Sequence, residues 1–373
     1  MSITAKGNAL NIASPIIGII NKSPTAQYYE IKNGHSINNG IIAAIIEDTA
    51  KINHLGVPVV NLKPGLLTLL DGDIVMLNPN GYVSILFRAN SQQNYLFVTE
   101  QCNSKCLMCP QPPKKRDDMD YYFDINMKVI NLLPQDMSVI GITGGEPTLL
   151  GEKLSILLAN ISQKLPETEV HLLTNGRALA WNNNVQKLVA IPRHTVIYAI
   201  SLHSDYYISH DYQAQCRHAF TQSLLGIHNL GRYDRRVEIR VIINKLNAHR
   251  LSKMAEFIYR NMPFVEHIAF MGLELMGYCK MNFDRLWVNP SDYIEQLREA
   301  TMMLAQNRIA VSIYNLPLCS LPDDLREFSR KSITEWKIRF PDECAGCNVI
   351  SECGGIFNSW SKVKEGIINP ILS

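Results

Sequence analysis

The stretch Cys102-Asn-Ser-Lys-Cys106-Leu-Met-Cys109 places three cysteines within eight residues. Three thiolates this close in sequence reach one small object only if the backbone wraps around it as a loop. Zinc would require a fourth nitrogen or sulfur donor, and the segment offers none. A [4Fe–4S] cluster held by three thiolates leaves one iron open to another ligand. The spacing therefore favours such a cluster over zinc, a ferredoxin-type electron carrier or a reduced cysteine-rich loop.

A second motif, Ile142-Thr-Gly144-Gly145-Glu146-Pro147, ends an apolar run downstream. A glycine pair after a strand indicates that something approaches the backbone closely. The cysteine loop and this motif together resemble the radical S-adenosylmethionine (SAM) superfamily. Its signature has three cysteines with an aromatic or apolar residue before the third, followed by a GGEP-type motif. Met108 occupies the apolar position.

The resemblance implies both cofactor and reaction. Cys102, Cys106 and Cys109 would ligate three irons, and the amine and carboxylate of SAM would chelate the fourth. Reductive cleavage of SAM would yield a 5′-deoxyadenosyl radical that abstracts a substrate hydrogen. The backbone of the glycine pair and Glu146, in the motif that Pro147 completes, is expected to meet the methionyl amine. The Glu146 carboxylate would either add charge beside that amine or anchor the loop.

Further cofactor contacts are expected where later strands end, because barrel chemistry gathers at the carboxyl ends of strands. Asn175 and Ser201 are expected to contact ribose or carboxylate oxygens, although either could instead form a strand-end turn. Arg240 lies within an apolar strand, where a cation needs an anionic partner. That partner is either SAM or a neighbouring carboxylate in a structural salt bridge. Met271 is expected to frame the adenine through its backbone.

The alternation of apolar runs with amphipathic segments predicts an α/β fold with a parallel sheet and right-handed crossovers. Six units agree with the partial (β/α)6 barrel, similar to a TIM barrel, that the resemblance implies. We expect this barrel at residues 94–288, after a small β-rich domain at 1–93 and before a C-terminal cysteine-rich extension at 289–373. The predicted strands are Tyr95–Thr99, Ser138–Thr143, Glu169–Thr174, Thr195–Ser201, Val237–Ile243 and His267–Met271.

The two outer regions carry weaker patterns. In the first, Ile74–Leu77 and Tyr82–Phe87 flank a turn-rich connection and predict a β-hairpin, with a further strand at Leu66–Leu70. In the last, a helical stripe precedes a strand near Ala310–Leu316. Four more cysteines follow, enough to close a coordination shell around either zinc or an auxiliary [4Fe–4S] cluster. They are Cys319, Cys344, Cys347 and Cys353.

Longer segments narrow the resemblance to one group of maturases, the C type of the His-Xaa-Ser repeat peptide system. These segments are Thr99–Pro113, Met271–Gly277, Asn315–Cys319 and Ser332–Lys337. The substrate implied is a ribosomally made precursor peptide that receives a post-translational modification. The implied partners are a sister radical SAM maturase and a reductase or flavodoxin-type electron donor.

Composition limits the alternatives. The chain has 373 residues, 46% of them hydrophobic, so it has enough apolar material for a sizeable core. Lys and Arg number 36 and Asp and Glu 34, so no global field favours nucleic acid. With no recognisable leader or long apolar stretch, we expect a cytoplasmic protein away from the membrane. Two alternatives stay open: a radical enzyme acting on RNA or a small molecule, and a non-catalytic metal-binding partner of a sister maturase.

Overall fold

Two eight-stranded sheets organise the chain in a computed structural model, which describes residues 3–22, 28–34, 40–47, 56–360 and 366–372. The chain divides into two compact units. The first comprises residues 1–99, 117–143 and 153–170, and the second comprises 100–116, 144–152 and 171–373. The predicted boundaries at 93/94 and 288/289 are not tested by this division and stay predictions.

The N-terminal sheet is antiparallel except for its β5–β6 pair, and its strand order is β1-β8-β7-β3-β4-β5-β6-β2. Its buried apolar side chains form a main core, which includes Ile31, Val75 and Leu77, and a smaller cluster at Ala44, Ile46 and Val59. The strands are β1 Ile3–Lys6, β2 Asn8–Leu10, β3 Ile16–Lys22, β4 Tyr28–Lys32, β5 Ile41–Ile46, β6 Val59–Asn61, β7 Ile74–Leu77 and β8 Tyr82–Phe87.

The predicted hairpin is confirmed, because β7 and β8 pair antiparallel over the expected residues. The predicted strand at Leu66–Leu70 is wrong. The Leu66 N–H donates to the Lys63 carbonyl (3.2 Å) and closes a turn that contains Gly65 at φ 72°. The Leu70 N–H donates to the Asp73 carboxylate (2.9 Å) instead of to a neighbouring strand. Leu67 and Leu69 are buried in the core from this loop, whereas Leu66 is exposed.

The second sheet follows the chain in order, from β9 to β16, and each strand pair whose register is resolved is parallel. The six predicted strands are confirmed to within two residues at each end. The sheet continues with β15, which confirms the strand predicted near Ala310–Leu316, and with β16, for which there was no prediction. Its strands are β9 Tyr95–Phe97, β10 Val139–Thr143, β11 Glu169–Thr174, β12 Val196–Ser201, β13 Arg236–Ile242, β14 His267–Met271, β15 Ala310–Tyr314 and β16 Ser329–Arg330.

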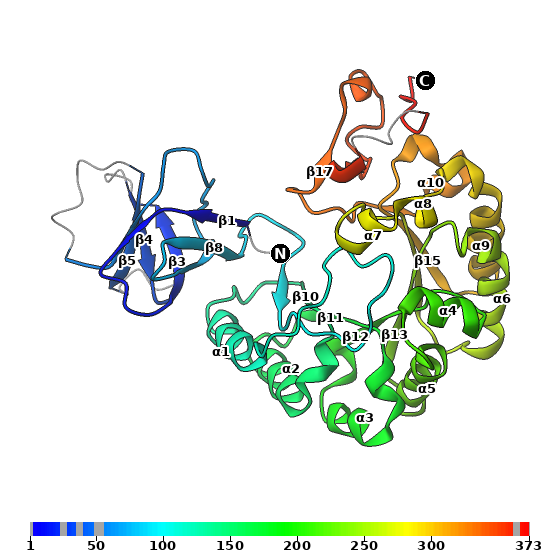
Figure 1. The fold of residues 1–373 in the computed structure, drawn as a ribbon, viewed down its shortest axis with the longest axis horizontal. Helices are drawn as coiled ribbons and strands as arrows, with labels where there is room; N and C mark the ends of the chain where they lie inside the picture. The colour runs from blue at the N-terminus through cyan, green and yellow to red at the C-terminus, as the bar shows by residue number, and fades with distance from the viewer. Residues whose placement is uncertain (1–2, 23–27, 35–39, 48–55, 361–365, 373) are drawn as a thin grey trace. The chain divides into compact units, whose positions relative to one another are not determined.

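Helices cover one face of the second sheet, and within the second unit α3, α5, α6 and α9 lie along the outer side of the strands (Figure 1). On β13, Val237, Ile239 and Val241 are fully buried and share one face of the strand. The helices are α1 Met119–Ile130, α2 Glu152–Lys164, α3 Asn182–Val189, α4 Tyr207–Ala214, α5 Ala219–Arg232, α6 Leu251–Asn261, α7 Gly277–Met281, α8 Phe283–Leu286, α9 Ile294–Gln306 and α10 Asp323–Arg326. A short pair, β17 Ile338–Arg339 and β18 Ile356–Phe357, lies near the C-terminus.

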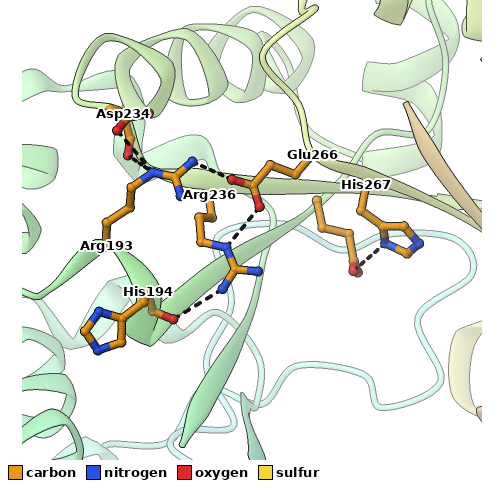
Figure 2. Close-up of polar contacts among 7 residues, drawn as sticks. Arg193, His194, Asp234, Arg236, Glu266 and His267 are labelled. Atoms are coloured by element: carbon orange, nitrogen blue, oxygen red, sulfur yellow. Dashed lines mark hydrogen bonds and ion pairs between the residues drawn. The ribbon is translucent and has the colours of Figure 1, made fainter. Parts of the chain in front are cut away.

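The amino ends of β13 and β14 are joined by ion pairs, which Figure 2 shows. Glu266 accepts from Arg193 (2.6 Å) and from Arg236 (2.9 Å), and Arg193 also pairs with Asp234 (3.1 Å). In barrels the amino ends of strands carry stability and the carboxyl ends carry chemistry. This network therefore belongs to the scaffold.

The predicted α/β class is confirmed, with a parallel sheet covered by helices and a separate β-rich sheet at the N-terminus. Among the helices in the described ranges, none has the length and apolar character needed to cross a membrane. The loops at residues 100–116 and 144–152, which follow β9 and β10, belong to the second unit with residues 171–373. All the residues predicted for the site therefore lie within one unit.

Candidate functional site

Three thiols share the loop that follows β9. Burial is the main reason why the pKa of Cys102 is raised to about 11, and the Glu146 charge adds to it. Burial likewise raises the pKa of Cys106, with further contributions from Cys102 and Cys109. The three thiols are thus close enough for their charges to act on one another. A bound metal would remove their protons and compensate the charge of the sulfurs.

The donor set of the loop fits an iron–sulfur cluster. Its three thiols come from one short segment, and that segment contributes no fourth nitrogen or sulfur donor of the kind that tetrahedral zinc requires. An iron–sulfur cube binds each thiolate at a different iron and leaves one iron open to another ligand.

Gly145 explains how the second motif meets the cysteine loop. A Cβ at this position would lie 2.0 Å from the Gln101 carbonyl oxygen and 3.1 Å from the Cys102 nitrogen. The next N–H, that of Glu146, donates to the same Gln101 carbonyl (2.8 Å). The requirement for glycine thus already arises from the cysteine loop itself, because the two backbones touch immediately before Cys102.

Glu146 is 1% exposed, and its carboxylate is saturated by the protein. One oxygen accepts from the Thr148 N–H (3.0 Å), the Thr148 hydroxyl (2.6 Å) and the Thr174 hydroxyl (2.5 Å). The other accepts from the Asn175 N–H (2.8 Å). This geometry favours the loop-anchoring alternative, in which Glu146 ties the end of β10 to the end of β11. Pro147 opens the short helical turn that follows.

The turn after β11 reaches the cysteine loop with two side chains. Asn175 donates to the Asn103 side chain (2.7 Å), and its amide nitrogen lies 3.9 Å from the Cys102 sulfur. Arg177 donates to the Asn103 carbonyl oxygen and to the Ser104 hydroxyl (2.9 Å). Asn175 was predicted at the site, whereas Arg177 was missed. The available signal was a basic residue directly after a strand-end Thr-Asn-Gly.

The far side of the loop is held by helix ends. The Lys105 and Leu107 N–H groups donate to the carbonyls of Ala214 (3.1 Å) and Gln213 (2.9 Å), where α4 ends. The Cys109 carbonyl accepts from the first turn of α7, at the Tyr278 N–H (2.9 Å). Met108 is buried, as expected for an apolar position. The loop has no regular structure of its own, and groups from several elements satisfy its backbone.

Arg240 has a carboxylate partner on its own strand. Its Nε lies 2.5 Å from Glu238 Oε1, and Glu238 Oε2 lies 2.8 Å from His267 Nδ1. The His267 Nε2 then meets the Ser312 hydroxyl (2.9 Å) on β15. Although burial works in the opposite direction, Arg240 and His267 lower the pKa of Glu238 to about 2. The salt-bridge alternative for Arg240 is therefore present in the structure.

Ser201 and Met271 share this inner face of the sheet. Ser201 on β12 lies opposite Arg240 on β13 in the sheet register. Met271 on β14 lies opposite Tyr314 on β15. Both are half-buried at the carboxyl ends of their strands. Their position is compatible with the predicted cofactor contacts, which stay predictions.

The second cysteine set lines one apolar pocket near the C-terminus. Cys353 Sγ accepts from the N–H groups of Leu318 (3.4 Å) and Gly355 (3.3 Å). Burial is the first cause that raises the pKa of Cys319 and of Cys344, and the other thiols add to it. The pocket brings all four predicted residues together with aliphatic and proline side chains; the cysteines are Cys319, Cys344, Cys347 and Cys353.

Comparisons with known proteins bear on the part of the chain that forms the second sheet. Residues 96–258 match the family model of the Radical SAM superfamily. This segment contains the cysteine loop, the glycine motif and the turn after β11, so the chain carries a radical SAM domain. The superfamily part of the sequence interpretation is confirmed. The assignment to the His-Xaa-Ser system is not tested. No curated protein matches the chain.

Several solved structures are similar at low identity. SuiB of Streptococcus suis bound to S-adenosylmethionine has 14% identity and a TM-score of 0.49 over 68% of this chain and 55% of its own. The structure of anSMEcpe with bound AdoMet and a peptide has 17% identity and a TM-score of 0.44, over 59% of this chain and 62% of its own. A radical SAM methyltransferase from Sphaerobacter thermophilus has 14% identity and a TM-score of 0.44, over 67% of this chain and 75% of its own. The chain thus spans between half and two thirds of the length of the first two.

Glu146→Gln should destabilise the protein although it preserves side-chain size. The new amide group places a donor opposite the donors of Thr148 and Thr174 or of Asn175, which leaves a buried group unsatisfied. We expect the free energy of unfolding in urea to fall by about 1–3 kcal/mol. As the control, Glu152→Gln removes an exposed carboxylate and should change it by less than about 0.5 kcal/mol. Equal stability of the two variants would contradict the anchoring role.

The Glu238 network should make the stability of the protein fall as the solution becomes acidic. Because the folded state lowers the pKa of Glu238 from 4.5 to about 2, ionised Glu238 stabilises the fold above pH 4.5. That contribution is lost as the pH falls from 4.5 toward 2. Urea midpoints measured between about pH 5 and about pH 3 should therefore drop more steeply for the wild type than for Glu238→Gln. Parallel pH profiles would show that Glu238 contributes nothing to this dependence.

Proposed function

We propose that this chain is a radical SAM enzyme that abstracts a hydrogen atom from a ribosomally made peptide and thereby installs a modification. The observation that supports it is the cysteine loop. Groups from the glycine motif, from α4 and from α7 hold the backbone of this loop, and residues 102–109 contain no further Cys, His, Asp or Glu. An open coordination position is useful only if a small molecule must bind there.

In this proposal Cys102, Cys106 and Cys109 hold the [4Fe–4S] cluster. When bound, the cluster supplies the electron that cleaves SAM to the 5′-deoxyadenosyl radical. The protein's task is to position and shield. Glu146 fixes the glycine motif against the loop, and Gly144 and Gly145 leave room for a close approach. Asn175, Ser201, Arg240 and the Met271 backbone are the proposed contacts for SAM.

Arg240 can serve SAM only together with its partner. Its bond to Glu238 uses the Nε–H, one of the five N–H groups of the guanidinium. Glu238 is in turn held by His267, so the arginine is oriented from behind. The three residues thus form a support for a polar ligand group at the inner face of β13.

The C-terminal pocket would hold a second cofactor, either an auxiliary [4Fe–4S] cluster or zinc. Four thiols suit either. Two backbone N–H groups that donate to the Cys353 sulfur would stabilise the thiolate form in both cases. The sequence resemblance favours the cluster, which could accept an electron from the substrate. Zinc would only fasten the C-terminal segment.

The substrate and partners rest on the sequence resemblance. We propose a His-Xaa-Ser repeat precursor as substrate, with a sister radical SAM maturase and a flavodoxin-type or other reductase as partners. We also propose a cytoplasmic location, where thiols remain reduced. RNA or a small molecule as substrate, or a scaffold without activity of its own, are the outcomes that the following experiments distinguish.

Anaerobically reconstituted protein should form 5′-deoxyadenosine from SAM under dithionite. Cys106→Ala should reduce this to background, because one iron loses its ligand. Cys216→Ala, which changes a cysteine outside both sets, should retain wild-type formation. Circular dichroism checks that both variants fold. A colourless wild type that leaves SAM intact would contradict the enzyme proposal and favour the scaffold.

Co-expression tests the peptide. The His-Xaa-Ser precursor is produced with the sister protein and with either the wild-type chain or Cys106→Ala. We expect the mass of the peptide to change from that of the unmodified precursor only when the wild-type chain is present. Mass spectrometry reads the difference directly, and fragmentation locates the residue. An unmodified peptide, from a chain that does cleave SAM, would exclude this peptide under these conditions and leave RNA or a small molecule.

A further inference from the structure

Arg177 is the one arginine in the described part of the chain that is less than a tenth exposed, at 9%. Its Nε donates to the Gln222 side chain (2.8 Å), and its Nη1 donates to the Asn103 carbonyl and to the Ser104 hydroxyl (2.9 Å). All three acceptors are neutral. A buried cation costs free energy unless an anion compensates it.

Other partly buried arginines of the protein follow that rule. Arg88 pairs with Asp73 (2.7 Å), Arg240 with Glu238 (2.5 Å) and Arg250 with Asp205 (2.7 Å). Arg177 has no carboxylate within ion-pair distance among the described residues, although it is buried more deeply than these. The buried Glu146 carboxylate, which also acts on Cys102, bonds to Thr148, Thr174 and Asn175 instead. A counter-ion for Arg177 therefore has to come from elsewhere.

The acceptors of Arg177 indicate where that counter-ion lies. Asn103 and Ser104 are the two residues that follow Cys102 in the loop, so the guanidinium is fastened to the backbone between the first two cysteines. Asn175, two residues earlier, lies within 3.9 Å of the Cys102 sulfur. The positive charge is thus held against the segment whose thiols would surround the cluster.

We infer that Arg177 is the charge partner of the iron–sulfur cluster at Cys102, Cys106 and Cys109; this inference rests on the proposed function. Three thiolates outweigh the positive charge of the cube, so the assembly is an anion. Net charge and hydrogen bonding near a cluster set its reduction potential. A fixed cation favours the reduced, more negative state. Arg177 is a positioning residue that also raises the potential.

The test compares Arg177→Gln, Arg177→Lys and the control Gln222→Ala in the full-length chain after anaerobic reconstitution. The readout is the midpoint potential of the cluster whose electron paramagnetic resonance signal changes on addition of SAM, which separates it from the C-terminal site. Iron content is measured in parallel.

We expect Arg177→Gln to shift the reduction equilibrium at least tenfold toward the oxidised state, about 59 mV for a one-electron couple. Arg177→Lys keeps the charge, so its reduction equilibrium should stay within threefold of that of the wild type. Gln222→Ala removes a neutral acceptor and should match the wild type. If Arg177→Gln loses its iron while Arg177→Lys keeps both iron and potential, the charge requirement is equally supported.

Two results would overturn the inference. One is an unchanged potential in an Arg177→Gln protein that retains its cluster. The other is equal iron loss in the glutamine and lysine variants, which would mean that the shape of the guanidinium matters and its charge does not. A wild-type chain that takes up no iron at the three cysteines is a separate result, since it contradicts the proposed function itself.

Discussion

The cysteine loop must satisfy its backbone polar groups without a helix or strand of its own, and much of the site follows from that constraint. The Gln101 carbonyl accepts a hydrogen bond from the glycine motif. The Lys105 and Leu107 N–H groups donate to carbonyls at the end of α4. The Cys109 carbonyl accepts from an N–H at the start of α7. Each partner lies in the segment that follows a different strand, β10, β12 or β14. A parallel sheet makes this possible because the carboxyl ends of its strands share one edge.

Two buried charged groups in the second unit have opposite environments. Glu238 is surrounded by partners, with Arg240 on one oxygen and His267 on the other, and its ionised form is strongly favoured. Arg177 is surrounded by neutral acceptors. The first arrangement is complete in the protein alone, as expected of a structural or orienting network. The second leaves a charge uncompensated, as expected where a cofactor supplies the counter-ion.

Much of the fold was predictable because it depends on local patterns. Apolar runs and turn residues identified β11 and β14 exactly and the other predicted strands to within two residues. The error at Leu66–Leu70 has a physical cause. Leucines buried from a turn have the same apolar pattern as leucines buried from a strand, and only hydrogen-bond partners distinguish them. The pairing of Glu238 with Arg240 was also visible in principle, since residues two apart share one face of a strand.

The sequence alone determined the chemistry of the donor set: three thiols in one short loop, a glycine pair after a strand, and four more cysteines that the fold brings into one pocket. Tertiary structure decided what the neighbouring side chains do. Glu146 became an anchor because the ends of β10 and β11 place four donors around it. Arg177 contacts the cysteine loop because β9, which precedes the loop, and β11, which precedes Arg177, end at the same edge of the sheet. Spacing along a chain determines which groups are available, whereas contacts between residues seventy positions apart depend on strand order and register.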